Sequence, residues 1–170
     1  MLVIGLSIAN GNLIIGVVIG LISSSLVFAI QASLITPIYQ SSILNIDNNN
    51  KTGKAYILKL EGLIFFGNMN KLFKQLNKCL NENSPETSKC LILDFNRVRF
   101  LDSSLIEKLA NFQRTAQKKN AYLLFTDLSL KHEQQFYRGD ILEKNESLNL
   151  VFPDIDRGLE WFQENLVEKR

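Results

Sequence analysis

The chain has 170 residues, enough for one domain with a sizeable core. Its net charge is only +2 and its basic residues are scattered, which argues against a nucleic-acid-binding surface. Two cysteines and one histidine, with no carboxylate cluster at ligand spacing, predict neither a disulfide framework nor a metal site. All charged residues lie at or after Asp47, so the first 46 residues suit an apolar solvent and the rest suits water.

Residues 13–38 predict a transmembrane helix. The run Leu13–Ile35 holds 23 residues without a charge, and at about 1.5 Å per residue such a helix crosses a hydrocarbon core of about 30 Å. A secretory signal is the competing interpretation, but no basic residue precedes the run and the run is longer than the apolar part of a typical signal. Residues 1–12 are expected to be the remnant of a preceding membrane segment, which would make the chain the C-terminal piece of something larger.

Two glycines in this apolar run, Gly16 and Gly20, form a G-x-x-x-G pair. Small residues at this spacing allow two helices to approach closely in lipid. Glycine is also common in membrane helices in general, so helix pairing and simple composition explain the motif about equally well.

A polar stretch over residues 39–53, with three asparagines at its centre, predicts a linker. Lys51 and Lys54 follow the apolar run, and no basic residue precedes it. The positive-inside bias therefore predicts an integral membrane protein whose C-terminal domain lies in the cytoplasm.

The soluble domain is expected over residues 54–170. Its patterns alternate between strand and helix, which favours an α/β fold with a mixed sheet and helices packed on it. We expect two strands joined by a tight turn at Glu61-Gly62, and a further strand at Cys90–Leu93 that a short loop joins to a helix beginning near Asp102. The other expected elements are helices over 68–81, 130–138 and from about 154 onward, and strands over 121–125 and 148–152.

Three stretches resemble a STAS domain, the module named for sulfate transporters and anti-sigma-factor antagonists. They are Leu60–Asn68, Leu93-Asp94 through Asp102-Ser103-Ser104, and Phe152–Trp161. The apolar run is similar to the last membrane helix of the SulP family of anion transporters, which precedes the STAS domain of that family. The order of helix, linker and STAS domain covers nearly the whole chain.

The resemblance implies a cytoplasmic regulatory STAS domain with the final membrane helix of a SulP-type sulfate or inorganic anion transporter, a fragment not competent for transport alone. The implied partners are the remainder of the transporter membrane domain or a second subunit, cytosolic regulatory proteins and the membrane. The alternatives are a phosphoswitch like that of the anti-sigma-factor antagonists and a stand-alone membrane-anchored interaction module. Leu105 stands where many STAS domains have glycine, which weakens the phosphoswitch hypothesis.

The residues Asp102, Ser103 and Ser104 are the candidate phospho-switch or partner-binding site. Ser104 and Glu107 have the spacing of a capping box, which favours a structural role for Ser104, and Asp102 or Ser103 is the alternative cap. A phosphate at this helix start would be tolerated, because it would add negative charge where the helix dipole is positive.

Catalysis finds little support in the sequence. Asp94, Asp102 and Asp127 lie near predicted strand ends, but no histidine or second carboxylate is expected to converge on any of them. Glycines at phosphate-loop spacing are absent. We therefore expect no enzyme activity and assign no catalytic, cofactor-binding or metal-binding residue.

Overall fold

The computed structural model describes residues 13–48, 51–82, 88–142 and 150–168, and the chain divides into two compact units, residues 1–35 and Thr36–Arg170. The first unit is described from helix α2 (Leu13–Leu34). The expected remnant over residues 1–12 lies outside the described residues.

Helix α2 is long and apolar enough to cross a membrane over Ile14–Leu34, and it is the one such helix in the described part of the chain. The hydroxyls of Ser25 and Ser33 each donate to the backbone carbonyl four residues earlier, at 2.8 Å. These hydroxyls are thus paired within the helix. The helix ends before residue 38, the expected limit, because Pro37 disfavours helical backbone at Thr36.

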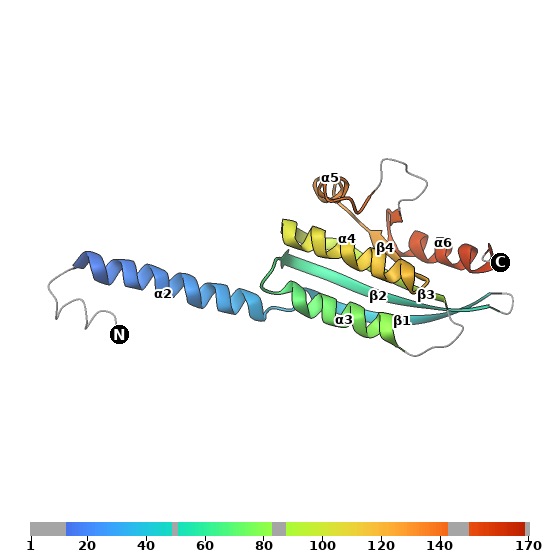
Figure 1. Cartoon of the computed structure of the whole chain (residues 1–170), viewed down its shortest axis with the longest axis horizontal. Coiled ribbons are helices and arrows are strands. Elements are labelled where there is room, and N and C mark those ends of the chain that lie inside the picture. The colour runs from blue at the N-terminus through green and yellow to red at the C-terminus, as the bar shows by residue number, and fades with distance from the viewer. Residues whose placement is uncertain (1–12, 49–50, 83–87, 143–149, 169–170) are drawn as a thin grey trace. The chain divides into compact units, whose positions relative to one another are not determined.

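The second unit contains a five-stranded sheet whose strand order follows the chain (Figure 1). Strand β1 pairs antiparallel with β2, and the other neighbouring strands are parallel. The strands are β1 (Ile38–Asn48), β2 (Lys51–Ile64), β3 (Ser88–Leu101), β4 (Ala121–Thr126) and β5 (Val151–Phe152); the helices are α3 (Met69–Asn81), α4 (Ser103–Lys118), α5 (Leu130–Arg138) and α6 (Ile155–Glu168). This mixed sheet with packed helices confirms the predicted α/β fold.

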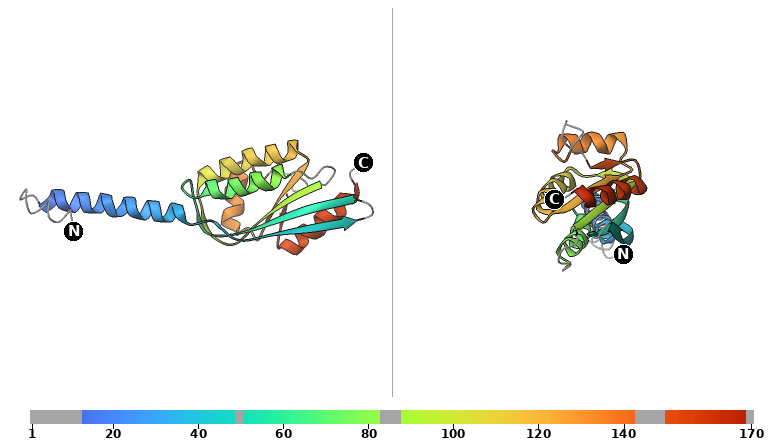
Figure 2. Two further views of the ribbon diagram at one scale, coloured as in Figure 1. Left: turned by 90° about the horizontal axis from the view of Figure 1, so that it is seen from below. Right: turned by 90° about the vertical axis from the view of Figure 1, so that its right-hand side faces the viewer.

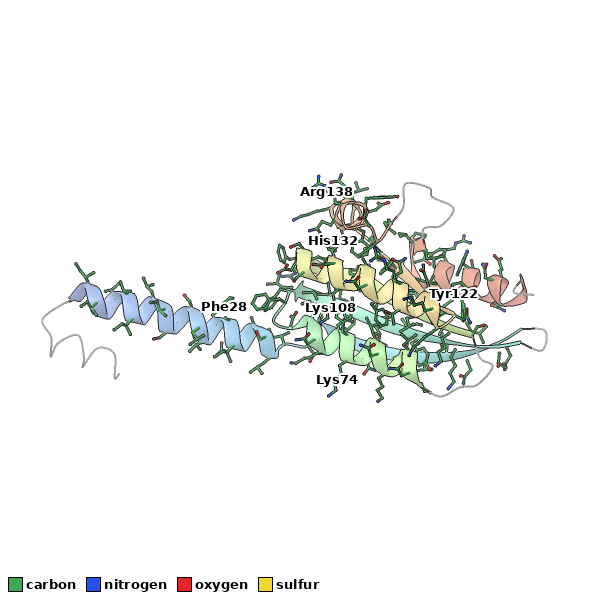
Figure 3. The ribbon with its side chains drawn as sticks, viewed as in Figure 1. Phe28, Lys74, Lys108, Tyr122, His132 and Arg138 are labelled. Carbon is green, nitrogen blue, oxygen red and sulfur yellow. The ribbon has the colours of Figure 1, made fainter. Side chains whose placement is uncertain are left out.

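Both faces of the sheet are covered, which explains why its central strands are apolar without interruption. Alternate residues of β2, β3 and β4 point to opposite faces. Helices α3 and α4 cover the face of Leu91, Leu93 and Phe125, and α6 covers the face of Cys90 and Ile92 (Figure 2). Phe136 brings α5 to the first of these clusters, and Figure 3 shows the side chains that fill the space between the helices and the sheet.

The prediction of a linker over residues 39–53 is wrong. Strand β1 occupies residues 38–48 and is in register with β2 from Ile38 opposite Leu60 to Asn48 opposite Lys51. Its polar composition arises because it is an edge strand with several solvent-exposed positions, while Ile46 packs against the cluster under α6. The sheet therefore begins three residues after Ile35.

The prediction of a tight turn at Glu61-Gly62 is also wrong, because β2 is continuous to Ile64. Gly62 has a φ of +77°, and the β2–β3 register shifts on both sides of it. At both shifts β3 carries one residue more than β2, so the irregularity is a bulge in β3, and the glycine beside it adopts the unusual backbone conformation without a Cβ penalty. The predicted loop after Leu93 is likewise strand, since β3 pairs with the end of β2 as far as Leu101.

Candidate functional site

The turn that begins α4 lies where β3 ends. The backbone N–H of Asp102 donates to the carbonyl of Ile64 at 3.0 Å, which ties the turn to the end of β2. The Asp102 carboxylate accepts the backbone N–H of Ser104 at 2.9 Å and the Ser104 hydroxyl at 3.0 Å. These bonds, first of all the one from the Ser104 N–H, hold the pKa of Asp102 below its usual range.

Asp102 is therefore the N-cap of α4, with extended backbone and a side chain that satisfies an otherwise unpaired N–H of the first turn. The capping box of Ser104 with Glu107 is not formed. The sequence pattern favoured Ser104 as the N-cap, with Asp102 as an alternative. Asp102 is the cap because the capping residue must precede the helix, which begins at Ser103.

The two serines differ in their accessibility. Ser103 is exposed, and its Oγ lies 3.4 Å from the Asp102 carboxylate, which makes only a weak hydrogen bond. Ser104 is half-buried and its hydroxyl is held by Asp102. The turn thus brings the three predicted residues together and leaves Ser103 exposed to solvent.

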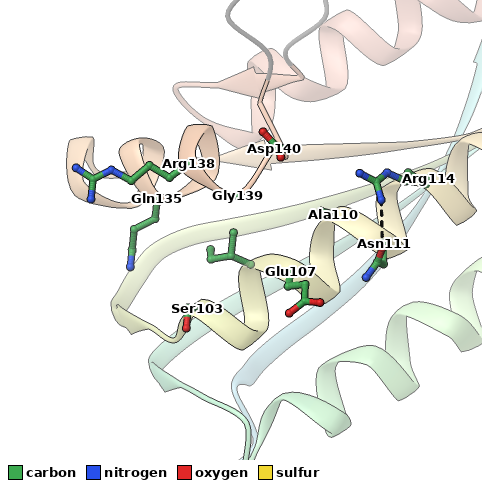
Figure 4. Close-up of a pocket in the computed structure, with 10 residues that line it drawn as sticks. Ser103, Glu107, Ala110, Asn111, Arg114, Gln135, Arg138, Gly139 and Asp140 are labelled. Atoms are coloured by element: carbon green, nitrogen blue, oxygen red, sulfur yellow. Dashed lines mark hydrogen bonds between the residues drawn. The ribbon is translucent and has the colours of Figure 1, made fainter.

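A groove of 510 Å³ extends from Ser103 along the space between α4 and α5 (Figure 4). Its floor is formed by Ile106, Ala110 and Gly139. The polar residues lining it are Ser103, Glu107, Asn111 and Arg114 from α4, and Gln135, Arg138 and Asp140 from α5 and its end. An apolar floor between charged walls is the kind of surface that can bind a segment of another protein.

Two contacts position α5 over this groove. The Gln135 side-chain amide donates to the carbonyl of Leu101 at 3.3 Å, next to the Asp102 turn. A Cβ on Gly139 would meet the Cγ2 of Ile106 at 2.1 Å, so only glycine permits this approach of the two helices. The sequence prediction missed the groove, although the polar residues 103, 107, 111 and 114 recur along α4 at helical spacing, which indicates a polar stripe beside the apolar one.

The structure also brings together two carboxylates that were not expected to converge. Asn96 donates its backbone N–H to Asp94 at 2.9 Å and its side-chain amide to Asp127 at 3.1 Å. Burial, reinforced by the nearby charge of Asp127, raises the pKa of Asp94. The described residues contain no group of three histidine, cysteine or acidic side chains placed to hold a metal ion.

Gly16 and Gly20 both lie on α2, one turn apart. A Cβ on Gly20 would have open space around it. Helix pairing through these glycines therefore stays a prediction.

Residues 47–157 match the STAS domain family. The chain belongs to this family. The match begins near the end of β1 and reaches the first turn of α6, so it includes the α4 turn and the groove.

A curated relative is a putative sulfate transporter, YvdB, of Bacillus subtilis, 25% identical over 133 residues that make up 78% of this chain. The chain spans about a quarter of that relative's length, since the aligned part is 24% of it.

Two solved structures show the same fold. A sulfate transporter family protein from Wolinella succinogenes is 28% identical, with a TM-score of 0.51, and the match covers 68% of this chain and 88% of that one. The murine anion transporter Slc26a9, in its inward-facing state, is 19% identical with a TM-score of 0.64, and the match covers 88% of this chain and 26% of that one.

Proposed function

We propose that this chain is the final membrane helix and the cytoplasmic, regulatory STAS domain of a SulP-type anion transporter. The observation that carries the proposal is the direct succession of α2 and the STAS sheet. Helix α2 ends at Leu34, and β1 begins at Ile38. Three residues separate a helix of membrane-spanning length from the first strand of the domain.

The extent of the structural match supports this succession. The STAS unit, Thr36–Arg170, holds 135 of the 170 residues. A match that covers 88% of the chain, as with Slc26a9, therefore reaches into α2. The likeness to a putative sulfate transporter over a quarter of its length supports the same assignment, with transport belonging to a longer polypeptide.

The regulatory part of the proposal rests on the α4 turn and the groove beside it. Asp102 and the groove floor build a rigid surface that begins at the exposed Ser103. Such a surface suits a cytosolic regulatory protein, the remainder of the transporter membrane domain or a second subunit. The site residues fix the shape of this surface and do not act on a substrate.

The membrane assignment is tested by expressing the full chain with a C-terminal green fluorescent protein or, separately, alkaline phosphatase. We expect the chain to resist alkaline carbonate extraction, the fluorescent fusion to be bright and the phosphatase fusion to be inactive. Ile22→Arg, which places a charge in the middle of α2, should release the protein from the membrane. Carbonate extraction of the unchanged chain, or an active phosphatase, would contradict the proposal.

The transporter assignment is tested in the Bacillus subtilis relative by replacing its matching C-terminal segment with this chain. Sulfate uptake by cells that carry the chimera should exceed uptake by cells that carry the truncated relative. Equal uptake by the two strains, with both proteins present in the membrane, would count against a role in transport.

A second candidate function is a phosphoswitch, and the exposure of Ser103 at the start of α4 is the observation that favours it. A phosphate there would face the positive helix end but also the nearby Asp102 carboxylate. Incubation with ATP and the cognate kinase, followed by mass spectrometry of Ser103→Ala and Ser104→Ala, tests it. Absence of phosphate from both serines of the unchanged chain rules it out.

A further inference from the structure

We infer that one end of the sheet, where β1 begins and β2 and β3 end, docks on the surface of a bilayer that contains anionic lipid. Three exposed apolar side chains, Leu63, Phe66 and Phe100, mark this end and are here called the apolar tip. Their exposed fractions are 54%, 67% and 44%. This inference rests on the proposed function, because it requires α2 to lie in the membrane.

The direction of the strands places the apolar tip. Strand β1 starts at Ile38, opposite Leu60, and runs antiparallel to β2. Strand β2 continues past this point to Ile64. The ends of β2 and β3 therefore project beyond the first residue of β1, and Figure 1 shows the tip of β2 at the same end of the domain as the first turns of α3 and α4.

The covalent connection to α2 is short at this end. The Pro37 carbonyl accepts the N–H of Glu61 at 2.9 Å, which fixes the start of the domain beside the end of β2. Leu34, the last residue of α2, is three residues from Pro37, a reach of about 11 Å at full extension. A membrane-embedded α2 thus restricts this end of the sheet to the neighbourhood of the headgroups.

The apolar tip is a fixed structure. Leu63 and Phe100 are paired in register across β2 and β3. Asn68, which is buried, accepts the N–H of Phe65 at 3.0 Å and donates to the carbonyl of Leu63 at 2.8 Å. These hydrogen bonds hold the turn that carries Phe66. The exposed position of the Phe66 ring is therefore set by an ordered turn.

The charges beside the apolar tip suit anionic headgroups. Arg97 and Arg99 are both exposed on β3, within three residues of Phe100. Arg97 lies over the Tyr39 ring at 4.7 Å and opposite Glu61 in the register, so its charge is partly offset. Arg99 makes no hydrogen bond or ion pair with the described residues and is the cation offered to lipid phosphate, which arginine binds with two parallel donors.

This combination favours lipid over a protein as the occupant. Aromatic and aliphatic side chains next to arginines are the residues that bury themselves in the headgroup region while their charges meet phosphate. Because the connection between α2 and β1 is short, a membrane-embedded α2 keeps the apolar tip close to the bilayer without a further partner. A docked protein is the outcome to be distinguished by experiment.

The test uses the full chain reconstituted in nanodiscs of mixed phosphatidylcholine and phosphatidylglycerol, with brominated lipid as the quencher. Trp161→Phe removes the native tryptophan, and Phe66→Trp or Phe100→Trp then reports on the apolar tip. Ile43→Trp is the matched control, because Ile43 is a similarly exposed apolar residue, 56% accessible, on β1. It lies five residues beyond Ile38, about 17 Å along the strand.

We expect brominated lipid to lower the emission of Phe66→Trp and of Phe100→Trp roughly twofold or more beyond its effect on Ile43→Trp, since interfacial side chains reach about 5–10 Å into the headgroup boundary. Adding Arg99→Gln to Phe100→Trp should weaken the quenching in mixed lipid and leave it unchanged in pure phosphatidylcholine. Resistance to carbonate extraction, measured on the same samples, reports separately on α2.

Three results would overturn the inference. If the chain resists carbonate extraction but the tryptophans at the apolar tip are not quenched, the proposed function stands and a protein is indicated as the occupant of the tip. If brominated lipid quenches Ile43→Trp as strongly as Phe66→Trp and Phe100→Trp, the domain does not face the bilayer with the apolar tip. If carbonate extracts the chain from the membrane, both the inference and the membrane assignment are overturned.

Discussion

Gly139, the C-cap of α5, lies so close to Ile106 of α4 that a Cβ on the glycine would be 2.1 Å from the isoleucine Cγ2. No real Cβ makes such a contact, so the two helices approach each other only because residue 139 is glycine. This approach sets the floor of the groove beside the α4 turn. The α4–α5 packing is therefore open to a direct mutational test.

Gly139→Ala should lower the free energy of unfolding by about 1–3 kcal/mol, the usual cost of overpacking. Ile106→Leu removes the Cγ2 methyl, so the double variant should recover part of the loss. The measurement is urea unfolding of the full chain in detergent, read as a double-mutant cycle.

The matched control for this prediction is Gly158→Ala on α6. A Cβ there would meet the Thr126 Cγ2 at 3.6 Å, an ordinary contact. Because alanine is favoured over glycine in a helix, this variant should be neutral or more stable by about 0.5–1 kcal/mol. Equal destabilisation by the two alanines would contradict the predicted close approach.

Asp102→Ala should destabilise the domain by about 1 kcal/mol, because it removes the N-cap of α4. Ser104→Ala should cost less, since the backbone N–H of residue 104 still reaches Asp102. The lowered pKa of Asp102 means that its contribution is present above the pKa of the unfolded chain and is lost as the pH falls through the folded value. Thermal melting at neutral and acidic pH measures both effects, and a larger loss from Ser104→Ala would contradict the assignment of the cap.

Asp94→Asn should raise the melting temperature at neutral pH. Burial raises the pKa of Asp94, so ionising it costs the folded state free energy, and the resulting stability is greatest at acidic pH and falls as the pH rises through the folded value. Asparagine keeps an oxygen to accept the N–H of Asn96 and carries no charge. The stabilisation should vanish below a pH of about 4, where the carboxyl is protonated in both states; a stabilisation independent of pH would refute this account.

His132 should make the domain sensitive to mild acid. The side chain is 3% exposed and its Nδ1 has no hydrogen-bond partner among the described residues. Burial, together with the charge of Lys131, lowers its pKa. Because the unfolded chain then binds the proton more readily, stability should fall as the pH drops below about 6.5 and level off below the folded pKa.

The His132 prediction is measured by comparing melting temperatures between neutral and mildly acidic pH. His132→Gln cannot titrate in this range and should show a shallower pH dependence. An unchanged dependence in His132→Gln would assign the effect to other groups.

The helices of the domain were predictable because each buries one side, so its apolar residues recur at helical spacing. Leu72 and Leu76 in α3 and Leu105 and Leu109 in α4 are all fully buried, as that spacing implies. Strand β1 was not predictable in this way, since an edge strand with an exposed face lacks a strong apolar pattern. The tight turn predicted at Gly62 was wrong for a related reason: a glycine with positive φ occurs in turns and also inside strands beside a bulge, and only the pairing with β3 distinguishes the two.

The site was predictable in part. Asp102, Ser103 and Ser104 are adjacent in sequence, so their common location follows from the α4 start alone. The groove depends on Ile106 and Gly139, which are far apart in the chain and meet only through the packing of α5. The convergence of Asp94 and Asp127 likewise follows from the register of β3 with β4, which local sequence does not encode.

The strand order of the sheet has a consequence for synthesis. Because spatial order equals chain order, each strand that leaves the ribosome can add to the free edge of those already formed, and none must insert between two others. The helix that covers the face of Cys90 and Ile92 is α6, the last element described. That face stays exposed to water until α6 has been synthesised, so the nascent domain passes through an aggregation-prone stage that chaperones would have to guard.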